Sequence, residues 1–161
     1  MTSIPSAVLR EMAAHAQKSY PAECCGLLLA SADGSLRFQP IANIAGTREG
    51  QGTSARTARD GYVMDPKELL STLEATEKEG GAVWAIVHSH PDVGAYFSRE
   101  DRDMALGGGQ EPLWPGVRYL VISARAAGVD GARLFTWDGA TRAFREEEVT
   151  GISTVLPREN R

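Results

Sequence analysis

The sequence predicts an α/β fold in which a mixed central β-sheet is flanked by helices. Segments with the apolar spacing of amphipathic helices alternate along the chain with short segments that are typical of strands. The chain has 161 residues and a mass of 17.3 kDa, and 42% apolar and 24% charged residues are ordinary globular usage. We therefore expect a single domain over residues 1–151 and a C-terminal tail over residues 152–161.

The N-terminal part of the chain predicts a helix followed by a β-hairpin. Ser6 is expected to cap the helix, which should end near Ser19 because the residue before Pro21 disfavours helical backbone. Two short segments, 27–30 and 36–41, have the apolar runs and alternation of strands, and a Gly-containing turn joins them.

The middle of the chain predicts a long loop and a second helix. Residues 46–59 are polar and rich in Gly, Thr, Ser and Arg, and loops of this length are more often functional than accidental. Asp65 and Glu68 form an Asp-x-x-Glu capping pattern at the start of the helix, and Gly80 and Gly81 should end it. The buried stripe of this helix is expected to be Leu69, Leu70 and Leu73.

A nearly continuous apolar strand over residues 82–87 follows and is expected to be covered on both faces. It continues directly into His88-Ser-His90. A third helix should begin at Ser98 as its cap and run to residue 106, before a run of glycines. Three further strands are expected over residues 118–123, 132–137 and 143–149.

Charge and composition bear on location and partners. The formal net charge is −4 and the isoelectric point is near 5.4, so bulk charge gives no reason to bind nucleic acid or an anionic membrane. The first residues have neither the cationic nor the apolar part of a signal peptide, and no apolar run approaches the length of a membrane span. The adjacent Cys24 and Cys25 do not suggest an oxidising compartment. We expect a cytoplasmic protein.

Two of the three histidines form a His-x-His sequence at the end of a strand. His88 and His90 project from the same face because side chains alternate along a strand, and two such imidazoles can converge on a metal ion. Asp101, in the first turn of the third helix, can return a carboxylate to them. Two histidines and one carboxylate are the ligand number of a catalytic zinc site with an open fourth position. An exposed histidine pair is the alternative. Cys24 or Cys25 as a fourth ligand would instead close the site, although packing is the favoured role of both.

These residues are part of a longer pattern. Glu23, His88-Ser-His90, then Ser98 after seven residues and Asp101 after two more reproduce the JAMM motif. The chain therefore resembles the JAMM (MPN+) metalloproteases, in particular their small bacterial single-domain members. The resemblance covers residues 4–149 and includes the segments 21–26, 64–70 and 88–98.

The resemblance implies an MPN/JAB (cytidine-deaminase-like) architecture and one Zn²⁺ per chain. His88, His90 and Asp101 would hold the zinc, Glu23 would be the general base and acid, and Ser98 would stabilise the tetrahedral intermediate. Each assignment has a simpler alternative from the residues alone. Glu23 can be a surface glutamate, Ser98 only a helix cap, and Asp101 a carboxylate favoured by the helix dipole.

The resemblance also implies a reaction and a partner. The substrate would be an amide or isopeptide bond at the C-terminal Gly-Gly tail of a ubiquitin-like or sulfur-carrier protein. Arg48, Arg56 and Arg59 of the long loop can meet acidic groups, but a solvated loop is an equal alternative. Two other functions stay open: a zinc hydrolase of the same fold that acts on another bond, and a non-catalytic MPN scaffold.

Overall fold

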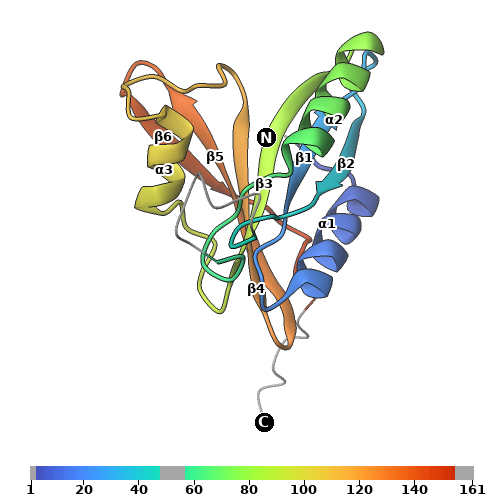
Figure 1. The fold of residues 1–161 in the computed structure, drawn as a ribbon, viewed down its shortest axis with the longest axis vertical. Coiled ribbons are helices and arrows are strands. Elements are labelled where there is room, and N and C mark those ends of the chain that lie inside the picture. The colour runs from blue at the N-terminus through green and yellow to red at the C-terminus, as the bar shows by residue number, and fades with distance from the viewer. Residues whose placement is uncertain (1–2, 48–56, 155–161) are drawn as a thin grey trace.

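The computed structural model describes residues 3–47 and 57–154. Figure 1 shows a twisted sheet with helices on both of its faces. The elements are α1 (Ser6–Ser19), β1 (Cys25–Ala30), β2 (Leu36–Ile41), α2 (Pro66–Lys78), β3 (Ala82–Pro91), α3 (Arg99–Leu106), β4 (Arg118–Arg125), β5 (Gly128–Asp138) and β6 (Ala143–Glu148).

The sheet confirms the predicted mixed architecture. Its strand order is β2-β1-β3-β4-β5-β6, and among these strands β3 and β4 pair in parallel while the other neighbours are antiparallel. β3 and β4 are therefore central. Parallel strands at the centre of a sheet place their carboxyl ends side by side, at one edge where loops can gather functional groups.

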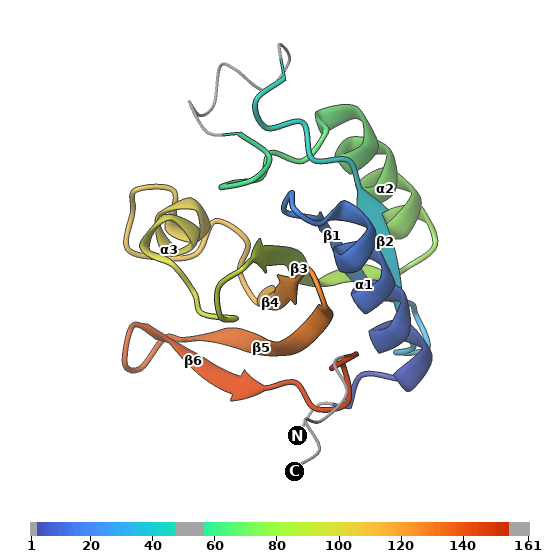
Figure 2. The same ribbon diagram turned by 90° about the horizontal axis from the view of Figure 1, so that it is seen from below.

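The two faces of the sheet bury separate apolar clusters. Leu28 packs with the buried face of α1, whereas its neighbours Leu27 and Leu29 pack on the opposite face with residues of α2 and α3. This alternation is the period-two pattern of a strand covered on both faces. Figure 2 shows α2 and α3 well apart, on either side of the end of β3.

The first helix has the predicted extent but not the predicted cap. It spans Ser6–Ser19, and its N-cap is Pro5, with no side-chain hydrogen bond at the cap. The Pro5 carbonyl already accepts from the backbone N–H of Leu9 at 3.0 Å, so Ser6 lies inside the first turn. The prediction that Ser6 caps the helix is therefore wrong.

The second helix begins as predicted at Asp65, whose carboxylate accepts from the N–H groups of Lys67 and Glu68. The second half of the capping pattern is wrong. The backbone N–H of Asp65 donates to the Ala42 carbonyl at 3.0 Å, and the Glu68 carboxylate instead accepts from the Ala42 N–H at 2.7 Å. The side chain of Glu68 thus ties α2 to the end of β2.

Two of the three leucines of the predicted buried stripe of α2 are partly buried, and the third is exposed. Leu69 and Leu73, one helical turn apart, pack against the cluster shared with α3, but Leu70 is 58% exposed. One residue along a helix is a rotation of about 100°, which turns Leu70 away from the face that its neighbours bury.

The strands extend the predicted ones. β3 continues through the histidines to Pro91 and is fully buried from Ala85 to His90. The third helix, its Ser98 cap and its end at the left-handed Gly107 are confirmed. Of the expected long loop, residues 46–47 and 57–59 lie outside helices and strands, whereas Arg48, Arg56 and the rest of 48–56 lie outside the described residues.

The last described residues pack on the domain. Ile152 is 3% exposed and belongs to the α1-side cluster, and the Thr154 N–H donates to the Val129 carbonyl at 2.8 Å. Residues 155–161 of the expected tail lie outside the described residues. Among the helices of the described ranges, none has the length and apolar character required to cross a membrane.

At Gly26 of β1 the neighbouring strand β2 leaves no room for a side chain. A Cβ atom there would lie 2.6 Å from the Gln39 carbonyl oxygen and 2.7 Å from the Phe38 ring. We expect Gly26→Ala to lower the free energy of unfolding by about 1–3 kcal/mol, the usual cost of overpacking. For a domain of this size each kcal/mol lowers Tm by about 2–4 °C.

The matched control is Gly139→Ala at the exposed β5–β6 turn, where a Cβ would meet nothing within 4 Å. Thermal unfolding followed by circular dichroism measures both variants. Equal Tm values for the two would contradict the close approach of β2 to Gly26.

Candidate metal centre

The two histidines lie at the carboxyl end of β3, between β1 and β4. His88 is opposite Cys25 on β1 and Val121 on β4, and His90 is opposite Ser123. Their exposed fractions are 0% and 6%, so the alternative of an exposed histidine pair is wrong. Both rings emerge from one face of the strand, as the alternation predicts, and their Nε2 atoms are 3.2 Å apart.

Asp101 brings a carboxylate to both rings. Its Oδ1 lies 3.1 Å from His88 Nε2, and its Oδ2 lies 3.1 Å from His90 Nε2. The two Nε2 atoms thus lie 3.2 Å apart, and each of them faces a different oxygen of the Asp101 carboxylate at 3.1 Å. A tetrahedral zinc site with bonds of about 2.0–2.1 Å separates its ligand atoms by about 3.3–3.4 Å. The donor set and its spacing therefore fit zinc.

A reciprocal capping box fixes Asp101. The Ser98 hydroxyl oxygen accepts from the Asp101 N–H at 3.0 Å, and Asp101 Oδ2 accepts from the Ser98 N–H at 3.0 Å. The carboxylate that faces the histidines is thus held by the first turn of α3. Ser98 uses its oxygen as the acceptor in this contact, so its hydroxyl proton can still be donated into the cleft.

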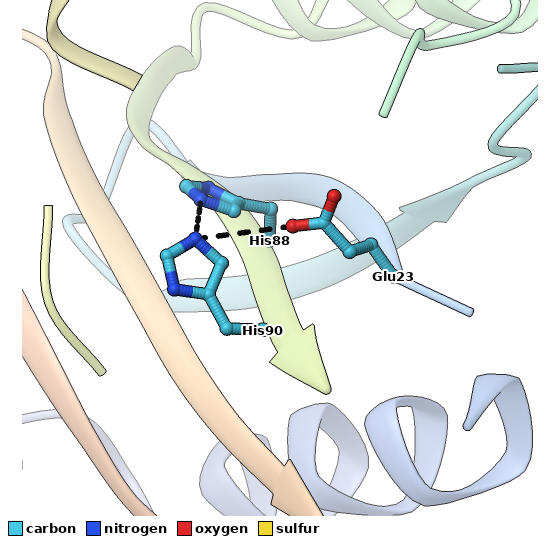
Figure 3. A group of neighbouring side chains, drawn as sticks. All are labelled: Glu23, His88 and His90. Atoms are coloured by element: carbon cyan, nitrogen blue, oxygen red, sulfur yellow. Dashed lines mark hydrogen bonds and ion pairs between the residues drawn. The ribbon is translucent and has the colours of Figure 1, made fainter. Parts of the chain in front are cut away.

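Glu23 lies two residues before β1 and is 5% exposed, so the alternative of a surface glutamate is wrong. Its Oε1 is 3.8 Å from His90 Nε2, and Figure 3 shows the carboxylate aimed at the two histidine rings. Glu23, His88 and His90 can each offer a ligand atom within 4.8 Å of the others. Glu23 stands farther from His90 than Asp101 does.

Burial and charge set the protonation of these groups. Burial lowers the pKa of His88, although its hydrogen bond to the Asp101 carboxylate acts to raise that pKa. Burial also acts to lower the pKa of His90, but the hydrogen bond and charge of Asp101 outweigh it and the pKa is raised. Burial acts to raise the pKa of Asp101, yet hydrogen bonds with both histidines hold that pKa far below its usual range. An ionised aspartate and a neutral histidine are the forms that bind metal.

The two cysteines are packing residues. Burial raises the pKa of the Cys24 thiol to about 11, and burial also raises the pKa of Cys25, whose Sγ donates to the Ile41 carbonyl at 3.3 Å. The metal-ligand cluster found among the described residues contains no sulfur. The packing role favoured from the sequence is supported over a fourth metal ligand.

A cleft of about 720 Å³ opens beside the cluster. Glu23, His90, Ser98 and Asp101 line one part of it, so every group of the motif except His88 reaches the cleft wall. The remainder is largely apolar, and its residues come from α2 and the segment before it, from β3 and β4, and from α3 and the loop that follows it. These residues include Met64, Leu69, Ile86, Met104, Trp114 and Tyr119.

Two residues beside the cluster have no counterpart in the sequence analysis. The Tyr62 ring stacks on His88, with ring centroids 4.7 Å apart and planes at 25°. The Asn43 amide donates to the Glu23 carbonyl at 2.9 Å. Both lie outside helices and strands, and neither belongs to a spacing pattern. Only their contacts with His88 and Glu23 in the folded chain reveal them.

Residues 5–138 match the family described as prokaryotic homologs of the JAB domain. The chain belongs to the prokaryotic JAB family. The JAB/MPN architecture and the resemblance to small bacterial members of the JAMM (MPN+) family are thereby confirmed.

Named relatives and a solved structure agree with this membership. The chain is 33% identical to a desampylase of Haloferax volcanii over 64% of this chain, a match that spans 63% of that relative's length. It is 33% identical to a probable TtuB-protein conjugate cleaving protease of Thermus thermophilus, over 82% of this chain and 73% of the relative. It is 30% identical to the CysO-cysteine peptidase of Mycobacterium tuberculosis, over 73% and 70%. A protein of Desulfitobacterium hafniense solved in solution is 28% identical and has a TM-score of 0.67, covering 92% of this chain and 90% of that one.

The geometry predicts that the protein takes up about one zinc ion per chain, with loss of the ion from His88→Ala and His90→Ala. Each substitution removes one of three ligand atoms, and a chelating site with two ligands binds zinc far more weakly. Elemental analysis of zinc-loaded and desalted protein measures the content.

His15→Ala is the matched control, because this third histidine lies on α1 beside Phe38, with ring centroids 5.6 Å apart. It should keep the full zinc content. Wild-type protein free of zinc after loading would refute the site, and so would equal zinc loss in all three variants.

Proposed function

We propose that the protein is a zinc-dependent metallopeptidase that hydrolyses an amide or isopeptide bond at the C-terminal Gly-Gly tail of a ubiquitin-like or sulfur-carrier protein. The observation that carries the proposal is the buried cluster of His88, His90 and Asp101, in which each Nε2 lies 3.1 Å from an oxygen of Asp101. The Glu23 carboxylate lies 3.8 Å from His90 Nε2, at the wall of an open cleft.

We assign His88, His90 and Asp101 as the residues that hold zinc. Their mutual spacing of 3.1–3.2 Å supports this choice over Glu23, which stands back at 3.8 Å from His90. Bound zinc supplies a Lewis acid that polarises a carbonyl and makes water a nucleophile near neutral pH. The additional distance of Glu23 leaves it available for proton transfer.

Glu23 is assigned as the general base and acid. Its carboxylate accepts the proton of the attacking water, and it then delivers that proton to the nitrogen of the leaving amine, so that one carboxylate serves both steps. The position fits this role because the Glu23 backbone is held from two directions: its N–H donates to the Ala58 carbonyl at 2.6 Å, and its carbonyl accepts from Asn43.

Ser98 is assigned as a donor to the developing oxyanion. It lines the cleft next to Asp101, and its hydroxyl oxygen accepts the backbone N–H of Asp101 while the proton remains available. One Ser98 side chain can therefore cap α3 and donate to the oxyanion at the same time.

The substrate class is supported by the names of the relatives. They are a desampylase, a protease that cleaves TtuB-protein conjugates and a peptidase that acts on CysO-cysteine. The second name describes cleavage of a conjugate between TtuB and a protein, and the third describes a peptidase for CysO joined to cysteine. The cleft beside Glu23 and His90, with its apolar remainder, gives room for an extended peptide segment of such a partner.

The two other functions make different demands on the site. A non-catalytic MPN scaffold requires neither the cluster of His88, His90 and Asp101, nor a buried carboxylate beside it, nor an open cleft. The presence of all three together supports catalysis. A zinc hydrolase acting on another bond would use the same groups, and the choice of substrate decides between the two.

The proposal is tested with fusions in which a Gly-Gly-ended carrier precedes a reporter, joined by an amide bond. We expect wild-type protein to release the reporter and a chelator to stop the release. Glu23→Gln should keep its zinc but lose about 10²–10⁴ in kcat, because a neutral amide cannot accept the proton. Asp101→Asn should lose the zinc itself.

Glu11→Gln, the same substitution on an exposed carboxylate of α1, is the control and should cleave like wild type. Retained turnover in Glu23→Gln would move the base elsewhere. Loss of zinc from Glu23→Gln together with zinc retention in Asp101→Asn would exchange the two assignments. Release of an ester reporter but of no amide fusion would favour the other hydrolase.

Ser98→Ala and Ser98→Gly separate the two roles of that hydroxyl. At an N-cap, alanine costs about 1 kcal/mol of stability but glycine only a few tenths. If the hydroxyl also donates in the reaction, both variants should lose about 10²–10³ in kcat, whatever their stability. Thermal unfolding and kcat at full zinc occupancy are measured together. Near-normal turnover in the glycine variant would leave Ser98 as a cap alone.

A further inference from the structure

The side chain of Asn43, two residues after β2, makes four hydrogen bonds to backbone groups. Its Nδ2 donates to the carbonyls of Glu23 at 2.9 Å and Gly61 at 3.1 Å. Its Oδ1 accepts from the N–H groups of Ala45 and Val63, both at 3.0 Å. An asparagine amide has two donors and one acceptor oxygen with two lone pairs, so its hydrogen-bonding capacity is full.

These bonds join the segment of Asn43 to two other parts of the chain at the cleft. One is the backbone of Glu23, the proposed base. Another is the pair of positions, Gly61 and Val63, that flank Tyr62. Backbone contacts continue the connection, because the Ile44 N–H donates to the Val63 carbonyl at 2.8 Å and Asn43 forms a β-bridge with Met64.

Tyr62 links these hydrogen bonds to the proposed metal ligands, because it contacts His88. Its ring stacks on the His88 imidazole at 4.7 Å and 25°. A metal-ligating histidine usually has its other ring nitrogen held by a carbonyl or carboxylate. His90 follows this rule, since its Nδ1 donates to the Gly94 carbonyl at 3.3 Å.

His88 does not follow the rule. Its Nδ1 is buried and has no hydrogen-bond partner among the described residues. The plane of the His88 ring therefore depends on packing, and the Tyr62 ring is the aromatic group stacked on it. Whatever holds Tyr62 in place also holds the ring that must present Nε2 to the metal.

We propose that Asn43 is a positioning residue for the metallopeptidase site: through one amide it holds the Glu23 backbone and the Tyr62 segment, and Tyr62 in turn sets the ring plane of His88. This inference rests on the proposed function, since it concerns the same base and the same ligand. Asn43 itself touches neither the zinc ligands nor the reacting atoms.

Asn43→Asp tests the inference at nearly constant shape. Aspartate keeps an acceptor for Ala45 and Val63 but cannot donate to the Glu23 and Gly61 carbonyls. We expect the zinc dissociation constant, measured by competition with a chromogenic chelator, to rise about tenfold. The absorption bands of the Co²⁺-substituted protein should shift, because they report ligand geometry. At saturating zinc, kcat should still fall by about tenfold or more, because Glu23 is displaced.

Asp138→Ala is the matched control for a loss of stability. Asp138 also accepts two backbone N–H groups, those of Ala140 at 2.9 Å and Thr141 at 3.4 Å, at the β5–β6 turn. It should lower Tm without changing zinc affinity or the Co²⁺ spectrum. The inference is wrong if Asn43→Asp has the zinc affinity, Co²⁺ spectrum and kcat of the wild type. It is also wrong if the changes in these three quantities are the same in Asn43→Asp and Asp138→Ala.

Tyr62 gives a second test that does not depend on the folding of the Asn43 variant. Tyr62→Leu, which removes the stacked ring, should weaken zinc binding about tenfold, and Tyr62→Phe, which keeps the ring, should restore it. Equal affinities in the two variants would overturn the role of stacking. Wild-type protein that binds no zinc would overturn the proposed function itself, whereas zinc-loaded, active wild type with insensitive Asn43 and Tyr62 variants overturns only this inference.

Discussion

The whole site depends on holding buried carboxylate oxygens within 3.1–3.8 Å of buried imidazole nitrogens. Asp101 is 8% exposed and Glu23 5% exposed, and His88 is fully buried. Removing such charges from water is costly unless they are paired or coordinate a metal. A divalent cation bound at this site would compensate the charges of two carboxylates. The central strands and the cap of α3 keep these groups together although their removal from water is unfavourable.

Local rules account for the approach of the three proposed ligands, which is why the sequence could predict that they lie close together. Alternation along β3 places His88 and His90 on one face, and the capping box brings Asp101 back from the first turn of α3. All three lie within fourteen residues, so short-range geometry decides their approach. Glu23 is different, because it reaches the site only through the antiparallel pairing of β1 with β3. No spacing argument finds such a contact, and only the family resemblance pointed to it.

The wrong predictions for Glu68 and Leu70 have different physical causes. Glu68 was assigned to its own helix cap, but tertiary structure offered it the Ala42 N–H instead. Leu70 was assigned to the core because it is apolar, although its angular position on α2 leaves it exposed. Asn43 and Tyr62 were missed because their roles consist entirely of contacts between segments remote in sequence. Local propensity determines the elements, whereas the choice of partner among equivalent polar groups is made by the fold.

The division of the site between two regions has a consequence for its chemistry. The proposed ligands belong to the continuous stretch from β3 to α3, while Glu23 belongs to the segment between α1 and β1. Metal affinity and proton transfer thus depend on different segments, and each can change without the other. An arrangement of this kind needs a connection that keeps the base in register with the ligands. Asn43 lies where the two regions meet, since its amide bonds the Glu23 carbonyl on one side and the backbone around Tyr62 on the other. A single polar side chain, outside the motif, can therefore couple the position of the base to the orientation of a metal ligand.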